Sequence, residues 1–264
     1  MKRTLLALSL SLIASSSIAS SFVSDEIVKT TAATLTGLES DHVVYAQEDK
    51  DIGMNVIRLV TGQVIYGDKD GKFFINGGSY TNSSVIMKDS KTGMLENHTE
   101  TLFNDLHKDI FSKIEGSGVI VKAPNEKLKI QVFYEPRCGY CKKLHKEEQS
   151  YLDAGISIEY IPYPIYDGER SYSSKSLAYI VSGENQEERN KRMKTMLAAF
   201  DADPKNPDIE KLVKDVDTSI LLKHKKEISS LAIQGTPYIL LENGQAIPGY
   251  APPANILAAA AAGK

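Results

Sequence analysis

The only two cysteines of this 264-residue chain, Cys138 and Cys141, are separated by Gly139 and Tyr140. A Cys-x-x-Cys pair can close a disulfide within one tight turn. In its reduced form the pair places a nucleophilic thiolate next to a second thiol. These residue types at this spacing are typical of thiol–disulfide chemistry. We therefore interpret Cys138–Cys141 as a redox-active disulfide, with Cys138 as the nucleophile and Cys141 as the resolving thiol that attacks the mixed disulfide.

Two predicted elements position this pair. The hydrophobic run 128–134 predicts a strand that leads into it, and the pattern over 141–153 predicts a helix that leads out of it. Cys138 would lie at the strand-side, more exposed end. There the unpaired N–H groups of the first helical turn and the helix dipole stabilise an anion. The neighbouring Arg137 adds a positive charge if its side chain turns toward the sulfur.

Two other uses of the pair stay open on the residues alone. Cys-x-x-Cys can be half of a zinc site, and His145 follows Cys141 by four residues, but a structural zinc site takes four ligands and the chain has no further cysteine. The remaining histidines show no paired ligand spacing; they are His42, His98, His107 and His224. A purely structural disulfide would close so small a ring that it stabilises the fold only weakly. We expect neither a metal nor another cofactor.

A second feature appears about a hundred residues later in the chain. Gly235-Thr236-Pro237 reads as a turn that enters a buried strand at 238–241, and Asn243-Gly244 is a hairpin turn signal. Proline is tolerated at the first residue of a strand. Thr-Pro also occurs in ordinary loops, so this feature alone assigns no function.

Taken together, the segments 133–145, 235–237 and 243–253 resemble the DsbC/DsbG family of periplasmic disulfide isomerases. The match is closer to the DsbC type, because Cys-Gly-Tyr-Cys is followed here by Lys143, Leu144 and His145. The resemblance implies that the Thr236–Pro237 peptide bond is cis and faces the active-site disulfide. It also implies a set of substrate-binding residues: Gly139, Tyr140, Thr236 and Pro237.

The sequence departs from this family at two points. Members of the DsbC type can carry a second, structural disulfide in the catalytic domain, for which this chain has no cysteine. Glu135 stands where the family often has an aspartate, and we expect only a mild effect on local packing.

Residues 1–19 have the pattern of a secretory signal peptide. Lys2 and Arg3 precede the apolar segment 5–14, which is too short to cross a bilayer as a helix, and Ser17-Ile18-Ala19 fits a small-x-small cleavage site. An uncleaved anchor is the alternative. Export favours an oxidising compartment, and the resemblance implies the periplasm of a Gram-negative cell, with no membrane anchor after cleavage. The formal net charge of −3 becomes more negative without Lys2 and Arg3, which argues against nucleic acid as a partner.

Residues 20–90 are predicted to form a small α+β unit with few large apolar residues. A domain of this size buries a modest core, and pairing with a second copy would cover its exposed edges. Asp41-His42 and the segment 49–51 are expected to be solvated surface. The pattern of Gly53-Met54, Gly62, Tyr66 and the segments 70–72 and 77–80 resembles the N-terminal, cystatin-like dimerisation domain of the same family. We expect a helix at 27–35 and strands at 43–47, 54–60, 63–67 and 72–76.

Residues 91–117 are predicted to be a linker with a helix at 99–115, and residues 118–264 a catalytic domain. In the linker helix Phe103, Leu106, Ile110 and Ile114 recur at helical spacing, and in the family this helix holds the catalytic domain away from the dimer base. The order β-α-β, inserted helices over 171–231, then β-β-α predicts a thioredoxin fold. In the insertion, Ile209, Leu212, Val213 and Val216 are expected to form one inner helix face.

The leading functional hypothesis is a homodimeric disulfide isomerase with chaperone activity. It would act on unfolded or misoxidised exported proteins and, by resemblance, be kept reduced by a DsbD-type membrane reductase. A net thiol oxidase is one alternative. A dimeric chaperone whose redox activity is secondary is the other.

Overall fold

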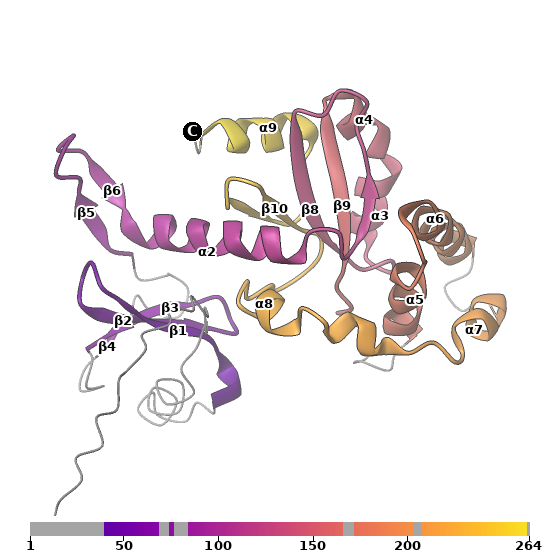
Figure 1. The fold of residues 1–264 in the computed structure, drawn as a ribbon, viewed down its shortest axis with the longest axis horizontal. Coiled ribbons are helices and arrows are strands. Elements are labelled where there is room, and N and C mark those ends of the chain that lie inside the picture. The colour runs from indigo at the N-terminus through magenta and orange to yellow at the C-terminus, as the bar shows by residue number, and fades with distance from the viewer. Residues whose placement is uncertain (1–39, 69–73, 77–83, 166–171, 203–206, 263–264) are drawn as a thin grey trace, which may run out of the picture.

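The computed structural model describes residues 40–68, 74–76, 84–165, 172–202 and 207–262 (Figure 1). The predicted signal peptide and the helix expected at 27–35 lie outside these residues. The described chain forms an N-terminal antiparallel sheet, a long helix α2 and a C-terminal sheet covered by helices. Among the described residues, no helix combines the length and the apolar character needed to cross a membrane.

The N-terminal sheet is a meander whose spatial order follows the sequence, β1-β2-β3-β4. A two-stranded hairpin, β5–β6, follows and projects away from this sheet (Figure 1). The strands expected at 43–47, 54–60 and 63–67 are confirmed with shifts of one or two residues at their ends. The bounds are β1 Val43–Asp49, β2 Met54–Leu59, β3 Val64–Gly67, β4 Phe74–Asn76, β5 Ile86–Lys88 and β6 Leu95–Asn97.

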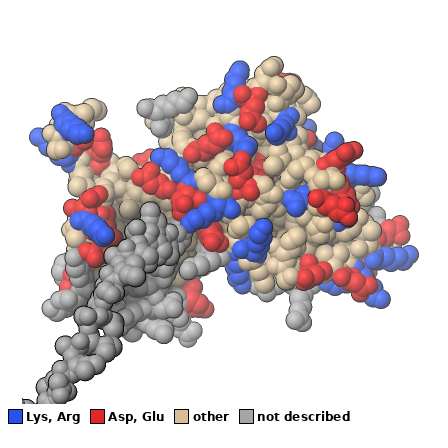
Figure 2. All heavy atoms as spheres, in the orientation of Figure 1, with Lys and Arg blue, Asp and Glu red and all other residues tan. Residues whose placement is uncertain are grey.

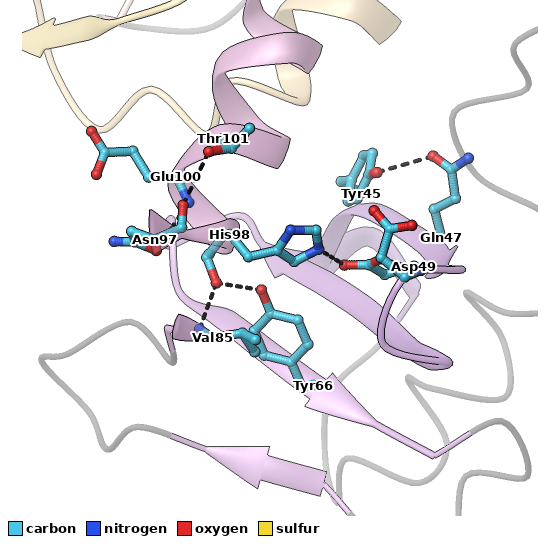
Figure 3. A network of polar contacts seen from close by, with 11 residues as sticks. Tyr45, Gln47, Asp49, Tyr66, Val85, Asn97, His98, Glu100 and Thr101 are labelled. Carbon is cyan, nitrogen blue, oxygen red and sulfur yellow. Dashed lines mark hydrogen bonds and ion pairs between the residues drawn. The ribbon is translucent and has the colours of Figure 1, made fainter. Parts of the chain in front are cut away.

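The interpretation of Asp49 as solvated surface is wrong. Asp49 is buried, and one of its carboxylate oxygens lies 2.6 Å from Nε2 of His98, at the first position of α2 (Figure 3). The other oxygen accepts the backbone N–H of Asp51 at 3.0 Å. A buried carboxylate needs such partners, because an unpaired one would lose its hydration without compensation. The end of β1 is thus joined to the start of the long helix.

Helix α2, His98–Ile114, begins at a capped position. The side chain of Asn97 accepts the backbone N–H of Glu100 at 3.2 Å, which satisfies one of the unpaired donors of the first turn (Figure 3). The hydroxyl of Thr99 accepts the N–H of Val85 at 2.9 Å and contacts the Tyr66 hydroxyl. These contacts fix the direction in which the helix leaves the N-terminal sheet.

The C-terminal sheet has the order β11-β10-β8-β9-β7. β8 and β9 are parallel, and the other neighbours are antiparallel. The order along the chain agrees with the predicted β-α-β, inserted helices and β-β-α. The bounds are β7 Val119–Val121, β8 Leu128–Tyr134, α3 Gly139–Lys146, α4 Glu148–Asp153, β9 Ile156–Pro162, α5 Tyr172–Val181, α6 Gln186–Ala202, α7 Pro207–Val213, a 3-10 turn Thr218–Leu222, α8 Lys225–Ser229, β10 Tyr238–Leu241, β11 Ala246–Pro248 and α9 Pro253–Ala262.

The two faces of this sheet are covered by different helices. Alternate residues of β8, such as Ile130 and Val132, pack in one core cluster with residues of α3 to α6 and α9. Phe133 packs on the other face, in a cluster that holds the apolar stripe of α2. The predicted stripe of α2 is therefore confirmed as buried. The linker helix of this chain is a core element of the C-terminal sheet as well as a connection.

Buried polar groups strengthen this contact. The side chain of Gln131 donates to the carbonyl of Phe111 in α2 at 3.0 Å and to the carboxylate of Glu159 at 3.3 Å. Glu159 also accepts the N–H of Gly118 at 3.0 Å, and its burial raises the pKa of its carboxyl group. β9 is buried on both faces apart from its last residue. Apolar and polar residues alternate in β9 although neither face of the strand is solvated. The polar residue Glu159 is instead hydrogen-bonded inside the protein, next to the contact between Gln131 and α2.

Two helical predictions need correction. The single helix expected over 141–153 is divided into α3 and α4 at Glu147, whose backbone N–H is shared between the carbonyls of Lys143 and Leu144. In the insertion, Leu212 is exposed although it was expected on the inner face of α7. α7 ends at Val213, so only Ile209 and Val213 of this short helix are buried.

A buried histidine joins the three parts of the molecule. Nδ1 of His107, in α2, lies 2.9 Å from the carbonyl oxygen of Gly244 in the β10–β11 turn. Its Nε2 lies 3.1 Å from Nη1 of Arg58 in β2. The neutral ring fits both contacts, donating through Nδ1 and accepting through Nε2. Burial, and then the neighbouring Arg58 charge, lower the pKa of His107 to about 4.

This arrangement predicts a loss of stability in mild acid. The pKa of His107 is depressed in the folded protein, so its contribution is complete above the unfolded value near 6.5. It is lost progressively as the pH falls from 6.5 toward 4. Between pH 7 and pH 5 we expect the free energy of unfolding to drop by about 2 kcal/mol more in the wild type than in a His107→Gln variant. Urea unfolding at both pH values tests this; equal drops in the two proteins would contradict it.

Candidate active site

The Cys-x-x-Cys pair lies where β8 passes into α3. Cys138 is the N-cap residue of α3, with extended backbone angles, and its N–H bonds to the carbonyl of Glu135 at 3.0 Å. Its side chain is 8% exposed, whereas Cys141, one turn into the helix, is 0% exposed. Both thiols are free. Cys138 is thus the more accessible sulfur, at the end of a helix where an anion is stabilised.

The second predicted segment lies directly against this thiol. The Thr236–Pro237 peptide bond is cis, and Sγ of Cys138 lies 3.1 Å from the carbonyl oxygen of Thr236. The antiparallel pairing of β10 with β8 explains the approach, because Tyr238 lies opposite Phe133. Pro237 is fixed on its other side, where its carbonyl accepts the N–H of Gly249 at 2.8 Å. The strand register therefore brings together segments about a hundred residues apart.

The residues between the cysteines face outward. Tyr140 is 63% exposed, which is unusual for so large a ring. A side-chain carbon added to Gly139 would meet no atom within 4 Å. The four predicted substrate-binding residues thus border the Cys138 sulfur from two sides. Gly139 and Tyr140 lie on the helix, and Thr236 and Pro237 lie on the loop before β10.

The environment of Cys141 differs sharply from that of Cys138. Burial, the largest cause, raises the pKa of the Cys141 thiol to about 12, and the neighbouring Cys138 adds to the effect. Cys141 is consequently a neutral thiol at physiological pH. An attack by its sulfur requires the loss of this proton.

Glu135, noted in the sequence as a departure from the family, is a buried acidic residue next to the active-site turn. Its side chain is completely buried, and its two carboxylate oxygens accept the N–H groups of Arg137 at 3.1 Å and Ile165 at 3.3 Å. Burial raises the pKa of this carboxyl group. Glu135 therefore joins the turn before Cys138 to the segment that follows β9.

Basic residues on α3 connect the active-site helix to the inserted helices. Nζ of Lys142 lies 3.1 Å from the carboxylate of Asp201 in α6 and 3.4 Å from the carbonyl of Phe200. Lys146 lies 3.6 Å from the same carboxylate. Over the described part of the face seen in Figure 2, basic and acidic side chains are interspersed. That face offers no extended basic surface of the kind that nucleic acids select.

Tyr250, in the loop between β11 and α9, is a residue that sequence reasoning missed. Its ring stacks on that of Tyr140, with a centroid distance of 6.4 Å and an interplanar angle of 27°. The ammonium of Lys143 lies 4.1 Å from the centroid of the Tyr250 ring. The only sequence signal was its place in the Pro248-Gly249-Tyr250 segment after the hairpin.

Among the described residues, the donor atoms near the two sulfurs are not gathered into a group of three or more. Nδ1 of His145, the zinc ligand considered from the sequence, lies 3.2 Å from the carboxylate of Glu148. Within the described part of the chain, one group of donor atoms comes within 4.8 Å of one another, and it lies in the N-terminal region: Asp49, Asp51 and His98. Both oxygens of Asp49 are already engaged by His98 and by the N–H of Asp51. Asp49 and His98 thus form a hydrogen-bonded pair that joins β1 to α2.

Comparison with known proteins agrees with the fold and the chemistry. The family model of the thioredoxin-like domain matches residues 118–264, which confirms the predicted thioredoxin fold. The chain is 30% identical over 234 residues to the thiol:disulfide interchange protein DsbC of Dickeya dadantii, covering 89% of this chain and 85% of that protein. It is 28% identical to the protein of the same name from Salmonella typhimurium, covering 87% of this chain and 84% of that protein. A thioredoxin-like oxidoreductase from Silicibacter pomeroyi matches at 19% identity with a TM-score of 0.39, covering 63% of this chain and 97% of that one.

Proposed function

Because the chain belongs to the DsbC family of thiol:disulfide interchange proteins, we propose that it reshuffles or reduces incorrect disulfides in exported proteins, with Cys138 as the nucleophile. One observation carries this proposal. The sulfur of the N-cap residue Cys138 lies 3.1 Å from the carbonyl that precedes the cis bond to Pro237. The site thus combines a thiol at a position that stabilises its anion with backbone groups able to pair with an extended substrate.

The first step is a thiol–disulfide exchange. The Cys138 thiolate attacks one sulfur of a substrate disulfide, so that a Cys138–substrate bond forms while the substrate bond breaks, and the second substrate sulfur leaves as a thiolate. Before ionisation the Cys138 thiol donates to the carbonyl of Thr236. Gly139, Tyr140 and Pro237 border the approach to the sulfur, and the backbone of Thr236 aligns the substrate segment.

Two routes resolve the mixed disulfide. Attack by another substrate thiol forms a new substrate disulfide and releases Cys138, which is isomerisation. Attack by Cys141 releases the substrate with one disulfide reduced by two electrons and leaves Cys138–Cys141 oxidised. In the reduced protein burial raises the pKa of the Cys141 thiol to about 12, and the same burial keeps its thiolate fraction low in the mixed disulfide.

Reactivation of scrambled ribonuclease in a glutathione buffer tests the proposal. The wild-type protein is expected to restore ribonuclease activity, and a variant with both cysteines changed to serine serves as the blank. Oxidation of reduced ribonuclease is measured in parallel. Rapid oxidation without recovery of the scrambled protein would favour the thiol oxidase hypothesis over isomerisation.

We further propose that the chain works as a homodimer through its N-terminal domain. Three large apolar residues of the β5–β6 hairpin are exposed, and such a patch is costly on a monomer; they are Ile86, Met94 and Leu95. The proposed dimer would place two catalytic domains around one cleft, where unfolded chains could be held. That arrangement supports the proposed chaperone activity.

The dimer proposal gives a direct prediction. A Leu95→Glu substitution introduces a charge into the patch, and burying it unpaired in the dimer would be costly. We expect the dimer dissociation constant to rise at least about tenfold, measured by light scattering over a concentration series. Leu212→Glu, on the exposed side of α7, is the matched control. A wild-type protein that stays monomeric at micromolar concentration would contradict the proposal.

The compartment and the reductant are also proposals. The pattern of residues 1–19 supports export to the periplasm, and a dithiol that must stay reduced there needs an electron donor. We propose a DsbD-type membrane reductase for this role. The redox state of Cys138 and Cys141 in cells with and without such a reductase, read by thiol alkylation, tests both statements.

A further inference from the structure

Tyr250 occupies a position that is fixed on three sides. The preceding residue, Gly249, donates its N–H to the carbonyl of Pro237 at 2.8 Å, and the carbonyl of the following residue, Ala251, accepts the hydroxyl of Tyr151 at 2.7 Å. The Tyr250 hydroxyl itself donates to the carboxylate of Glu147, at the break between α3 and α4. The ring is therefore held in place by the cis-proline loop, α4 and the end of α3.

The ring of Tyr250 supports the exposed ring of Tyr140. Tyr140 and Lys143 are three residues apart on α3 and so lie on the same side of the helix. Both contact Tyr250, the first by offset stacking and the second with its ammonium over the ring. Tyr140 keeps 63% of its surface exposed while resting on this support. The result is an aromatic shelf, made of Tyr140 and Tyr250, that continues from the Cys138 site.

We propose that this shelf binds an aromatic or large aliphatic side chain next to the reacting cysteine of the substrate, and that Tyr250 is a specificity-determining residue. The inference rests on the proposed function, because it names the substrate segment that the same site selects. Incompletely folded proteins expose apolar side chains that the native fold buries. A shelf beside Cys138 would favour disulfides in such segments over those surrounded by polar residues.

The test uses two short peptides whose single cysteine is disulfide-linked to thionitrobenzoate. One has phenylalanine on both sides of the cysteine and the other has serine. Attack by Cys138 on the peptide sulfur forms the mixed disulfide and releases the coloured thionitrobenzoate anion, so one absorbance trace gives the rate. The quantity compared is the ratio of the two rates within each protein. This ratio is independent of a change in general reactivity.

We expect the wild-type protein to prefer the phenylalanine peptide by about two- to tenfold, the range of an aromatic contact. Tyr140→Ser and Tyr250→Leu are each expected to bring the ratio close to one. Tyr250→Phe, which keeps the ring but loses the bond to Glu147, is expected to retain most of the preference. Leu212→Ala, on the exposed surface of α7, is the control and is expected to keep the wild-type ratio.

The outcomes separate the two proposals. A wild-type protein that reacts with both peptides at equal rates would overturn the shelf while leaving the proposed function intact. A preference that survives in Tyr250→Leu would remove Tyr250 from the proposal. A wild-type protein that reacts with neither peptide would sink the proposed function, and the shelf with it. Because Tyr140 is exposed, its variant should fold and gives an answer even where Tyr250→Leu does not.

Discussion

Replacing Cys138 with serine is expected to reduce the reactivation of scrambled ribonuclease to the level of the buffer alone. A serine hydroxyl at this N-cap position cannot form a disulfide with the substrate, so the mixed disulfide on which both routes depend cannot form. The remaining thiol, Cys141, is completely buried, and its pKa of about 12 keeps it protonated. It therefore cannot replace Cys138.

The matched variant is Cys141→Ser, which keeps the nucleophile and removes the resolving thiol. Mixed disulfides with substrate are expected to accumulate, since they can be released only by another thiol. Net reduction of the substrate should be lost while part of the isomerisation remains. Non-reducing electrophoresis and mass spectrometry of the trapped species measure both effects. Trapped species in Cys138→Ser, with none in Cys141→Ser, would reverse the two roles.

A Gly244→Ala substitution is expected to destabilise the protein by about 2–5 kcal/mol. Gly244 has a φ of +85°, and a Cβ atom there would lie 1.9 Å from the carbonyl oxygen of Asn104 in α2. The contact is with backbone, so it can be relieved only by moving the β10–β11 turn away from the helix. That movement would also break the 2.9 Å contact between Gly244 and His107.

Gly53→Ala is the control for this prediction. Gly53 has a similar φ of +68°, but a Cβ atom there would meet nothing within 4 Å. Its substitution should cost only the conformational strain, about 1–2 kcal/mol. Urea unfolding of both variants separates crowding from strain. Equal losses in the two proteins would mean that the turn and α2 are not tightly packed against each other in solution.

Local patterns in the sequence were sufficient for most of the secondary structure. The hydrophobic run 128–134 is β8 without a shift, and α2 begins one residue before the predicted helix and ends one residue before its predicted end. Periodicity and capping act over a few residues, so they can be read without knowing the rest of the fold. The same reasoning placed Leu212 wrongly, because a seven-residue helix has too few turns to define an inner face.

Burial of polar residues was not predictable in the same way. Asp49 is a strand-end aspartate next to a turn, and Glu159 is an acidic residue in an alternating strand. Both patterns suggest solvent exposure, yet each carboxylate is buried against α2 or its first residue. Their partners, His98 and Gln131, lie tens of residues away in the chain. Only the packing of the long helix α2 brings each buried carboxylate next to the partner that hydrogen-bonds with it.

The sequence by itself determined that this chain has one pair of cysteines, that the pair lies between a strand and a helix, and that Cys138 is the sulfur nearer the surface. These properties depend on neighbouring residues. Tertiary structure alone decided that α2 covers one face of the C-terminal sheet and that Tyr250 supports Tyr140. It also gave the 3.1 Å contact between the Thr236 carbonyl and the Cys138 sulfur, two segments that only the family resemblance had placed next to each other. Each of these contacts joins segments brought together by strand register and helix packing, which depend on long-range interactions that no local pattern encodes.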